Sequence, residues 1–158
     1  MQPQDVFNRG FDDATAAIDA WLPSLAAHAT IDREQASRYW RVRLTPHQRN
    51  ACPVEMMLSR DQVFDCDIGP ESAVNQPIAD LGLFLPMLRA VTEGRVLLRS
   101  WRAQATGSEL VRELVVALAP EQSWSMRRRI RAGNATTEAS AVACDQVYVA
   151  YRRDLNAP

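Results

Sequence analysis

Apolar residues recur every three or four positions in the first part of the chain, the spacing that places them on one side of an α helix. The stripe consists of Phe7, Phe11, Ala14, Ile18, Trp21 and Leu25. It predicts an amphipathic helix over residues 5–22, ended or kinked by Pro23, and a further turn over 23–28. The charged stretch 32–37 predicts another short turn.

The period of the pattern then changes to two, which is typical of a strand with one buried face. Trp40, Val42 and Leu44 alternate with polar residues and predict a strand over 39–44. Residues 54–59 and 62–68 are separated by only a short gap, so they predict a hairpin.

Residues 78–93 predict a second helix, which is apolar on nearly every side and is therefore buried under the sheet or in a subunit contact. Pro77 suits its first position, Pro86 predicts a kink or a break, and Gly94 suits the position just past its end. The rest of the chain predicts strands over 95–103, 110–118, 124–131 and 142–152, with a tight turn at 106–107 and a mobile loop over 132–140.

This order of elements is that of an α+β protein and not of a βαβ protein. We expect helices packed on one face of a curved, mainly antiparallel sheet of about 5–7 strands. The length of 158 residues fits one domain. We take this domain as residues 1–153, followed by a frayed tail over 154–158.

Composition narrows the functional classes. The net charge is −1, with 18 basic and 19 acidic residues, so neither nucleic acid nor a membrane is an expected partner. Every basic residue is Arg, as codon bias in a GC-rich genome explains, and the lack of Lys excludes Schiff-base catalysis and a P-loop lysine. Three scattered cysteines, a polar N-terminus and the lack of a long apolar run predict a cytoplasmic protein.

The arginine-rich strand is the most conspicuous candidate site. Arg127, Arg129 and Arg131 would share one face and could bind phosphate or carboxylate groups, unless that face is simply solvated or paired with neighbouring acids. Arg128 would lie on the other face, in an otherwise apolar row. Because a buried Arg must be paired, Arg128 predicts either an internal salt bridge or an anion site in a pocket.

A turn at Thr106-Gly107 would bring together a second group of side chains on the flanking strands. Trp101 would lie opposite Arg112, forming a cation–π pair, and Arg102 would lie diagonal to Glu113. Trp101 and Arg112 are therefore candidate ligand-binding residues, with ordinary cross-strand pairing as the alternative.

Asp65 and Asp67 would project from one face of a strand. Paired carboxylates serve general acid–base chemistry or bind a hard metal ion. Arg41 and Arg43 have the same spacing on a nearby strand, so cross-strand ion pairs, which Glu55 could join, are the alternative.

His28 and His47 are the only histidines. We expect a partly buried structural position for His28, whereas His47 lies in a loop and is a candidate ligand-binding residue. One His and one Cys are too few for a zinc site, so we predict no metal and no cofactor. A nucleophilic pair of a His with Cys52 or Cys144 has no local support.

Three functional hypotheses follow. The first is a non-catalytic protein that binds a small molecule or another protein as a homodimer, because segment 81–88 offers more apolar surface than a small monomer usually needs. The second is a small enzyme with an apolar pocket, which requires two of Asp65, Asp67, His47 and a pocket Arg to converge in one cleft. The third is nucleic-acid binding through residues 127–131, which the balanced charge disfavours.

Overall fold

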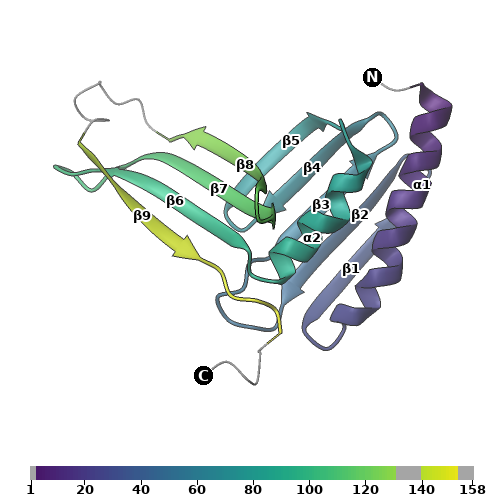
Figure 1. Cartoon of the computed structure of the whole chain (residues 1–158), viewed down its shortest axis with the longest axis horizontal. Helices are drawn as coiled ribbons and strands as arrows, with labels where there is room; N and C mark the ends of the chain where they lie inside the picture. Colours follow the sequence, from purple (N-terminus) through teal and green to yellow (C-terminus); the bar gives the residue numbers. More distant parts are fainter. Residues whose placement is uncertain (1–2, 131–139, 153–158) are drawn as a thin grey trace.

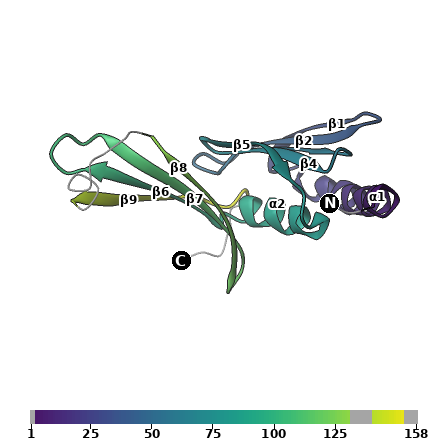
Figure 2. The same ribbon diagram turned by 90° about the horizontal axis from the view of Figure 1, so that it is seen from above.

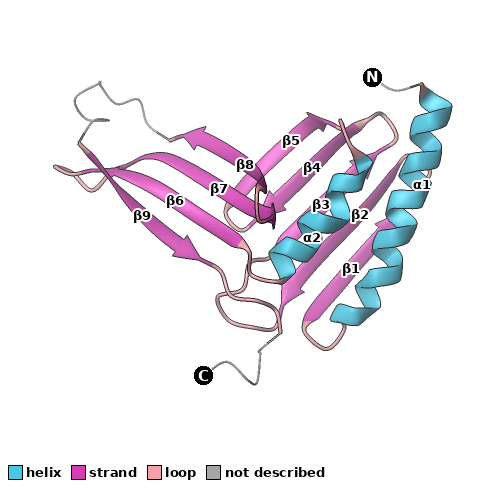
Figure 3. Cartoon of the chain, viewed as in Figure 1, coloured by secondary structure: helices cyan, strands magenta, loops and turns pink. Residues whose placement is uncertain are grey.

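The computed structural model describes residues 3–130 and 140–152, which form two α helices and two antiparallel sheets (Figures 1 and 3). The helices are α1 (Gln4–Trp21) and α2 (Phe84–Thr92), and the 3₁₀ turns are η1 (Leu22–Leu25) and η2 (Leu81–Leu83). The first sheet contains β1 (Ala29–Gln35), β2 (Tyr39–Pro46), β3 (Val54–Ser59), β4 (Val63–Ile68) and β5 (Glu71–Pro77). The second contains β6 (Val96–Ala103), β7 (Glu109–Ala119), β8 (Gln122–Arg129) and β9 (Ala141–Val147). The predicted α+β class and the antiparallel pairing are confirmed.

The first sheet is a meander in which each strand pairs with the next one along the chain. Both helices lie on the same side of it (Figure 2). The side facing the helices is apolar: Trp40, Val42 and Leu44 of β2 are all 0% exposed, whereas Arg41 and Arg43 point to the other side. This confirms the strand predicted from the period of two, and β3 and β4 confirm the predicted hairpin.

Helix α1 buries one stripe of its surface against the first sheet. Phe7, Phe11 and Ile18 are at most 1% exposed, and the helix begins and ends one residue earlier than the predicted range 5–22. The indole Nε1 of Trp40 donates a hydrogen bond of 3.1 Å to the Asp19 carboxylate, which links the helix to β2. Full burial of one large apolar side chain contributes about 1.5–3 kcal/mol, so this stripe is a main source of stability.

The second helix is shorter than predicted. Residues 71–77 form β5, and the predicted helix 78–93 is helical only from η2 onwards. Asp80 caps η2 by accepting a hydrogen bond from the backbone N–H of Gly82. Pro86 lies in the first turn of α2, where its missing N–H costs nothing, so the predicted kink is replaced by a helix start.

Helix α2 is buried within the chain itself. Phe84, Met87 and Leu88 are at most 1% exposed, and they pack in the core shared by α1 and both sheets. The apolar surface of segment 81–88, from which a subunit contact was predicted, is therefore largely used inside one molecule. Gly94 follows the helix at a φ of +75°, as predicted for the position past its end.

The second sheet has the strand order β8-β7-β6-β9, because the chain returns after β8 to pair β9 with β6. Val96, Leu114 and Val116 anchor it in the main core. The rest of the sheet reaches away from the helices (Figures 1 and 2), so most residues of β8 and β9 are exposed.

The expected antiparallel sheet with helices on one face is the five-stranded one, within the predicted 5–7 strands, and four further strands among the described residues form a second sheet. One local prediction was wrong. The charged stretch 32–37 begins inside β1 and is not a turn. Residues 132–139 of the predicted loop and the predicted tail 154–158 lie outside the described residues. Within the described part of the chain, neither helix is both long and apolar enough to cross a membrane.

Candidate functional site

A buried carboxylate joins the two sheets. Glu71, at the start of β5, has a side chain only 1% exposed. Arg112 of β7 donates from Nη1 to Oε1 of Glu71 at 2.8 Å. Arg128 of β8 donates from Nε and Nη2 to the two carboxylate oxygens at 3.1 and 3.2 Å. Arg112 also donates two hydrogen bonds to Glu109. We call Glu71, Arg112, Arg128 and Glu109 the inter-sheet ion cluster.

The inter-sheet ion cluster is electrostatically balanced, with two carboxylates and two guanidinium groups. The hydrogen bonds that Arg112 donates to Glu109, and next the one that it donates to Glu71, raise the pKa of Arg112, and the bonds from Arg112 lower the pKa of Glu109. Arg112 and Glu109 therefore stabilise each other's ionised form. The buried Glu71 carboxylate is paired with two guanidinium groups, as a buried charge requires.

The turn before β5 places Glu71 at the junction of the sheets. Gly69 has a φ of +56°, and its backbone N–H donates to the Pro53 carbonyl at 3.0 Å. A Cβ at this position would lie 2.8 Å from the Tyr148 hydroxyl, so Gly is required both by the backbone angle and by the close neighbour.

The structure decides two predictions about the second sheet. Arg128 forms the internal salt bridge that was one of its two alternatives, although Arg128 itself is 55% exposed and the buried partner is Glu71. The predicted pairing of Trp101 with Arg112 was wrong, because Trp101 lies opposite Val111. The guanidinium of Arg127, on β8, lies 4.9 Å from the centre of the Trp101 ring instead.

A groove of about 500 Å³ lies between the free edges of the two sheets. One side is β5 with Phe64 of β4 beneath it, and the other side is β8. We call it the inter-sheet groove; it is lined by Phe64, Ser72, Ala73, Val74, Gln76, Pro77, Trp124, Ser125, Met126, Arg127 and Arg128. The lining mixes apolar side chains with neutral polar ones and includes two arginines and no acid. Arg128 is already paired with Glu71, whereas Arg127 lies over the Trp101 ring.

Strand β8 presents a regular backbone edge to this groove. The N–H of Ile130 donates to the Leu110 carbonyl on β7, and the register continues without a shift to Ser123. Because backbone groups alternate in direction along a strand, the N–H groups of Ser123, Ser125 and Arg127 point away from β7. Arg127 and Arg129, predicted to share one face, do so, whereas Arg131 lies outside the described residues.

Asp65 and Asp67 lie on the face of the first sheet away from the helices. Of the cross-strand ion pairs predicted for Arg41 and Arg43, those with Glu55 are formed: both arginines bind Glu55 on the intervening strand. Asp65 accepts a hydrogen bond of 2.6 Å from a backbone N–H of β5. The two aspartates line a shallow depression of about 200 Å³.

The remaining candidates lie elsewhere. His47 Nε2 is 3.2 Å from the Thr30 hydroxyl, next to the loop between β2 and β3. Burial raises the pKa of the Cys52 thiol to about 12, which opposes a nucleophilic role, while Cys144 is exposed on β9. Asp65 with Asp67, His47 and Arg128 therefore occupy three separate places, and the convergence that an active site of these groups requires is not found.

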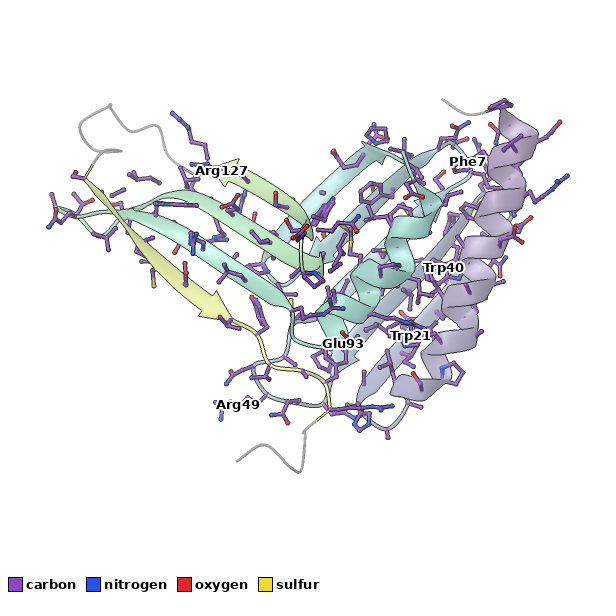
Figure 4. All side chains as sticks on the ribbon, in the orientation of Figure 1. Phe7, Trp21, Trp40, Arg49, Glu93 and Arg127 are labelled. Atoms are coloured by element: carbon purple, nitrogen blue, oxygen red, sulfur yellow. The ribbon has the colours of Figure 1, made fainter. Side chains whose placement is uncertain are left out.

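A second cleft, of about 400 Å³, lies between the end of α1 and the end of α2. Trp21 and Glu93 face it from the two helix ends (Figure 4). Its charged groups are engaged locally: Glu93 pairs with Arg95, and Arg152 donates to the carbonyl of Ser24.

Sequence reasoning missed Glu71. The signal that could have found it is indirect: Arg112 and Arg128 both interrupt apolar rows and so require a buried acid. Comparison of the chain with protein-family models, curated proteins and solved structures finds no match, so the geometry of the inter-sheet groove carries the functional argument.

Proposed function

We propose that the protein is a non-catalytic binding protein whose ligand is an extended, acidic segment of another polypeptide. This segment lies along β8 in the inter-sheet groove. The observation that carries the proposal is the meeting of two free strand edges at one groove, whose lining combines apolar side chains with arginines and contains no acid. An exposed strand edge offers a row of backbone hydrogen bonds to an added strand, and adjacent side chains supply the selectivity.

Strand β8 is the better of the two edges for pairing. β5 contains a shift in register opposite Phe64 and Cys66, a residue with positive φ at Asn75, and a proline at its end. Such features prevent regular strand addition. β8 keeps a regular register with β7 over residues 123–129, so its outward N–H and C=O groups are evenly placed.

The side chains around the groove favour a ligand that alternates apolar and acidic residues. Side chains on one face of an added strand would meet Phe64, Val74 and Met126, and acidic ones on the other face would reach Arg127, since Arg128 is already paired with Glu71. A charge-assisted hydrogen bond contributes about 1.5–3 kcal/mol, enough for one or two such contacts to determine the preference for acids.

Two other classes of ligand can be distinguished by the binding experiment described below. The volume of the groove also suits a small anionic molecule, but its open form between two strand edges favours an extended chain. Arginines on β8 would attract nucleic acid by charge, in which case affinity would not depend on backbone pairing.

The probe is a fluorescein-labelled peptide of alternating Val and Glu with the length of β8, 8 residues, measured by fluorescence anisotropy. Two matched peptides serve as controls: one has Lys in place of Glu, and one is N-methylated at alternate backbone positions. We expect binding of the first peptide only. The Lys peptide has the opposite charge, and the N-methylated peptide lacks the backbone N–H donors that pair with β8. Equal binding of the N-methylated peptide would overturn strand addition, and tighter binding of a labelled oligonucleotide or of citrate would replace the peptide by that class.

Matched variants locate the interaction. Arg127→Glu should weaken binding of the acidic peptide at least tenfold, about 1.4 kcal/mol. Arg49→Glu makes the same charge change in the loop between β2 and β3, outside the lining of the groove and near the bottom of the view in Figure 4, and should leave binding unchanged. Ser125→Pro removes an outward N–H without touching the pairing with β7, so it should abolish binding while the thermal unfolding midpoint stays near that of the native protein. Undiminished binding by Ser125→Pro would place the ligand elsewhere.

A further inference from the structure

The edge strands of the two sheets differ in how well they resist pairing with another strand. β1 exposes the charged run Asp32, Arg33 and Glu34, and β5 carries a bulge and ends in Pro77. β8 carries three consecutive arginines, 127–129, which repel a second copy of the same edge. Charges, prolines and bulges are the usual means by which proteins keep sheet edges apart.

Strand β9 has none of these protections within its described residues. Its pairing with β6 runs without a shift from residue 141 to residue 147 and includes no proline. Its one charged residue, Asp145, is already held by Arg99 through two hydrogen bonds of 2.7 Å. Val142 and Val147 are 55% and 69% exposed. In both views no other described element lies beyond β9 (Figures 1 and 2).

The direction of the backbone groups on β9 follows from one hydrogen bond. The N–H of Tyr148 donates to the Val96 carbonyl of β6 at 3.2 Å. Since backbone groups alternate, the even-numbered residues of β9 pair with β6, and the odd-numbered ones, Ala141, Ala143, Asp145 and Val147, point outward.

We propose that a second copy of this chain pairs its β9 with this β9 in an antiparallel register centred on Cys144, giving a homodimer. The geometry selects this register. It overlaps all seven residues of β9. It also places Ala143 opposite Asp145 of the partner subunit, so that the outward backbone groups of both residues form hydrogen bonds. A register centred on Asp145 would set two carboxylates directly opposite each other, which is unfavourable. The two four-stranded sheets then form one continuous sheet.

This interface is independent of the inter-sheet groove, because β8 and β9 are opposite edges of the same sheet. It also differs from the subunit contact that segment 81–88 suggested, since that segment is largely buried inside the chain. One pair of strand edges buries less surface than a standard interface, so we expect a dimer that dissociates on dilution at roughly micromolar concentration.

The register makes a specific prediction for cross-linking. Cys144 would face its counterpart in a non-hydrogen-bonded pair, in which Cα atoms lie about 4.5 Å apart, within the range of about 4.4–6.8 Å that a disulfide spans. Diamide, added as a two-electron oxidant, should therefore convert two Cys144 thiols into one intermolecular disulfide and take up the two hydrogen atoms. The other two cysteines are buried, so the band of a covalent dimer should disappear in Cys144→Ser.

Sedimentation equilibrium without oxidant tests the interface itself. The native protein and Cys144→Ser should both be dimers at high concentration. Ala143→Pro, which removes an outward N–H and leaves the pairs with β6 intact, should be monomeric. Ser125→Pro on β8 is the control and should remain dimeric, so a failure of peptide binding and a failure of dimerisation can be told apart. A native protein that is monomeric throughout, or an Ala143→Pro dimer, would overturn the proposal.

Discussion

Replacement of Glu71 by Gln tests how the two sheets are held together. The change keeps the shape of the side chain but removes the charge and puts an amide NH₂ next to guanidinium groups. Removing one partner of a buried ion pair costs about 3–5 kcal/mol. Arg128 is 55% exposed and can regain water, and Arg112 keeps its bonds to Glu109. We therefore expect a loss of about 2–3 kcal/mol, at or below the lower end of that range.

Urea denaturation followed by tryptophan fluorescence measures this loss as a change in the free energy of unfolding. For a chain of this size each kcal/mol shifts the thermal midpoint by about 2–4 °C, so a fall of about 5–10 °C is expected. Glu109→Gln is the matched control, because Glu109 is more exposed than Glu71 and contacts only Arg112 of the two arginines. Its loss should be at most about 1 kcal/mol.

Equal stability of Glu71→Gln and Glu109→Gln would contradict a structural role of the buried carboxylate. A double variant Glu71→Gln with Arg128→Gln that shows no coupling, meaning that the two losses simply add, would contradict it as well. Both results would mean that apolar contacts alone set the position of the second sheet.

Three further measurements follow from the structure. Arg112 lowers the pKa of Glu109 in the folded protein. The stability that this pair adds is therefore present above the unfolded pKa of about 4.3 and lost as the pH falls through the folded pKa. In urea denaturation between about pH 6 and pH 3, Glu109→Gln should lose less stability than the native protein. In dilute native protein only the exposed Cys144 should react quickly with a chromogenic disulfide reagent, because burial raises the pKa of the Cys52 and Cys66 thiols to about 12. Fast reaction of all three thiols would contradict the burial of Cys52 and Cys66. Asp19→Ala leaves the buried indole N–H of Trp40 without its acceptor and should cost about 1–2 kcal/mol in urea unfolding, with Asp19→Asn recovering part of it.

The elements that the sequence predicts well are those whose burial repeats along one face. Helix α1 and strand β2 each place large apolar residues on one side, so local spacing identifies them. Strands β1 and β5 were missed because they are edge strands, where only the first residue of each is buried. An edge strand needs little apolar surface, so its sequence resembles that of a loop or a helix start.

Contacts between distant parts of the chain are the part that local patterns could not supply. The loop between β6 and β7 spans residues 104–108 and not two residues, and the register shifts between Trp101 and Arg102. Trp101 therefore lies opposite residue 111 and not 112. Arg128 required a partner, but nothing in the sequence near Glu71 distinguishes that acid from the other acidic residues. Both errors concern which residues meet across strands, and register depends on turn length and tertiary packing.

The burial of Glu71 also constrains how this sequence can change over generations. Loss of the acid would leave two guanidinium groups without their carboxylate partner, and loss of an arginine would leave the carboxylate with too few partners. Replacement of all three by apolar residues often leaves the free energy of unfolding unchanged. Position 71 lies 41 residues before position 112 and 57 residues before position 128. They should nonetheless covary among descendants of the same ancestor, as one acid with two arginines or as three apolar residues, with mixed combinations rare. This covariation is a signature by which distant relatives could be recognised.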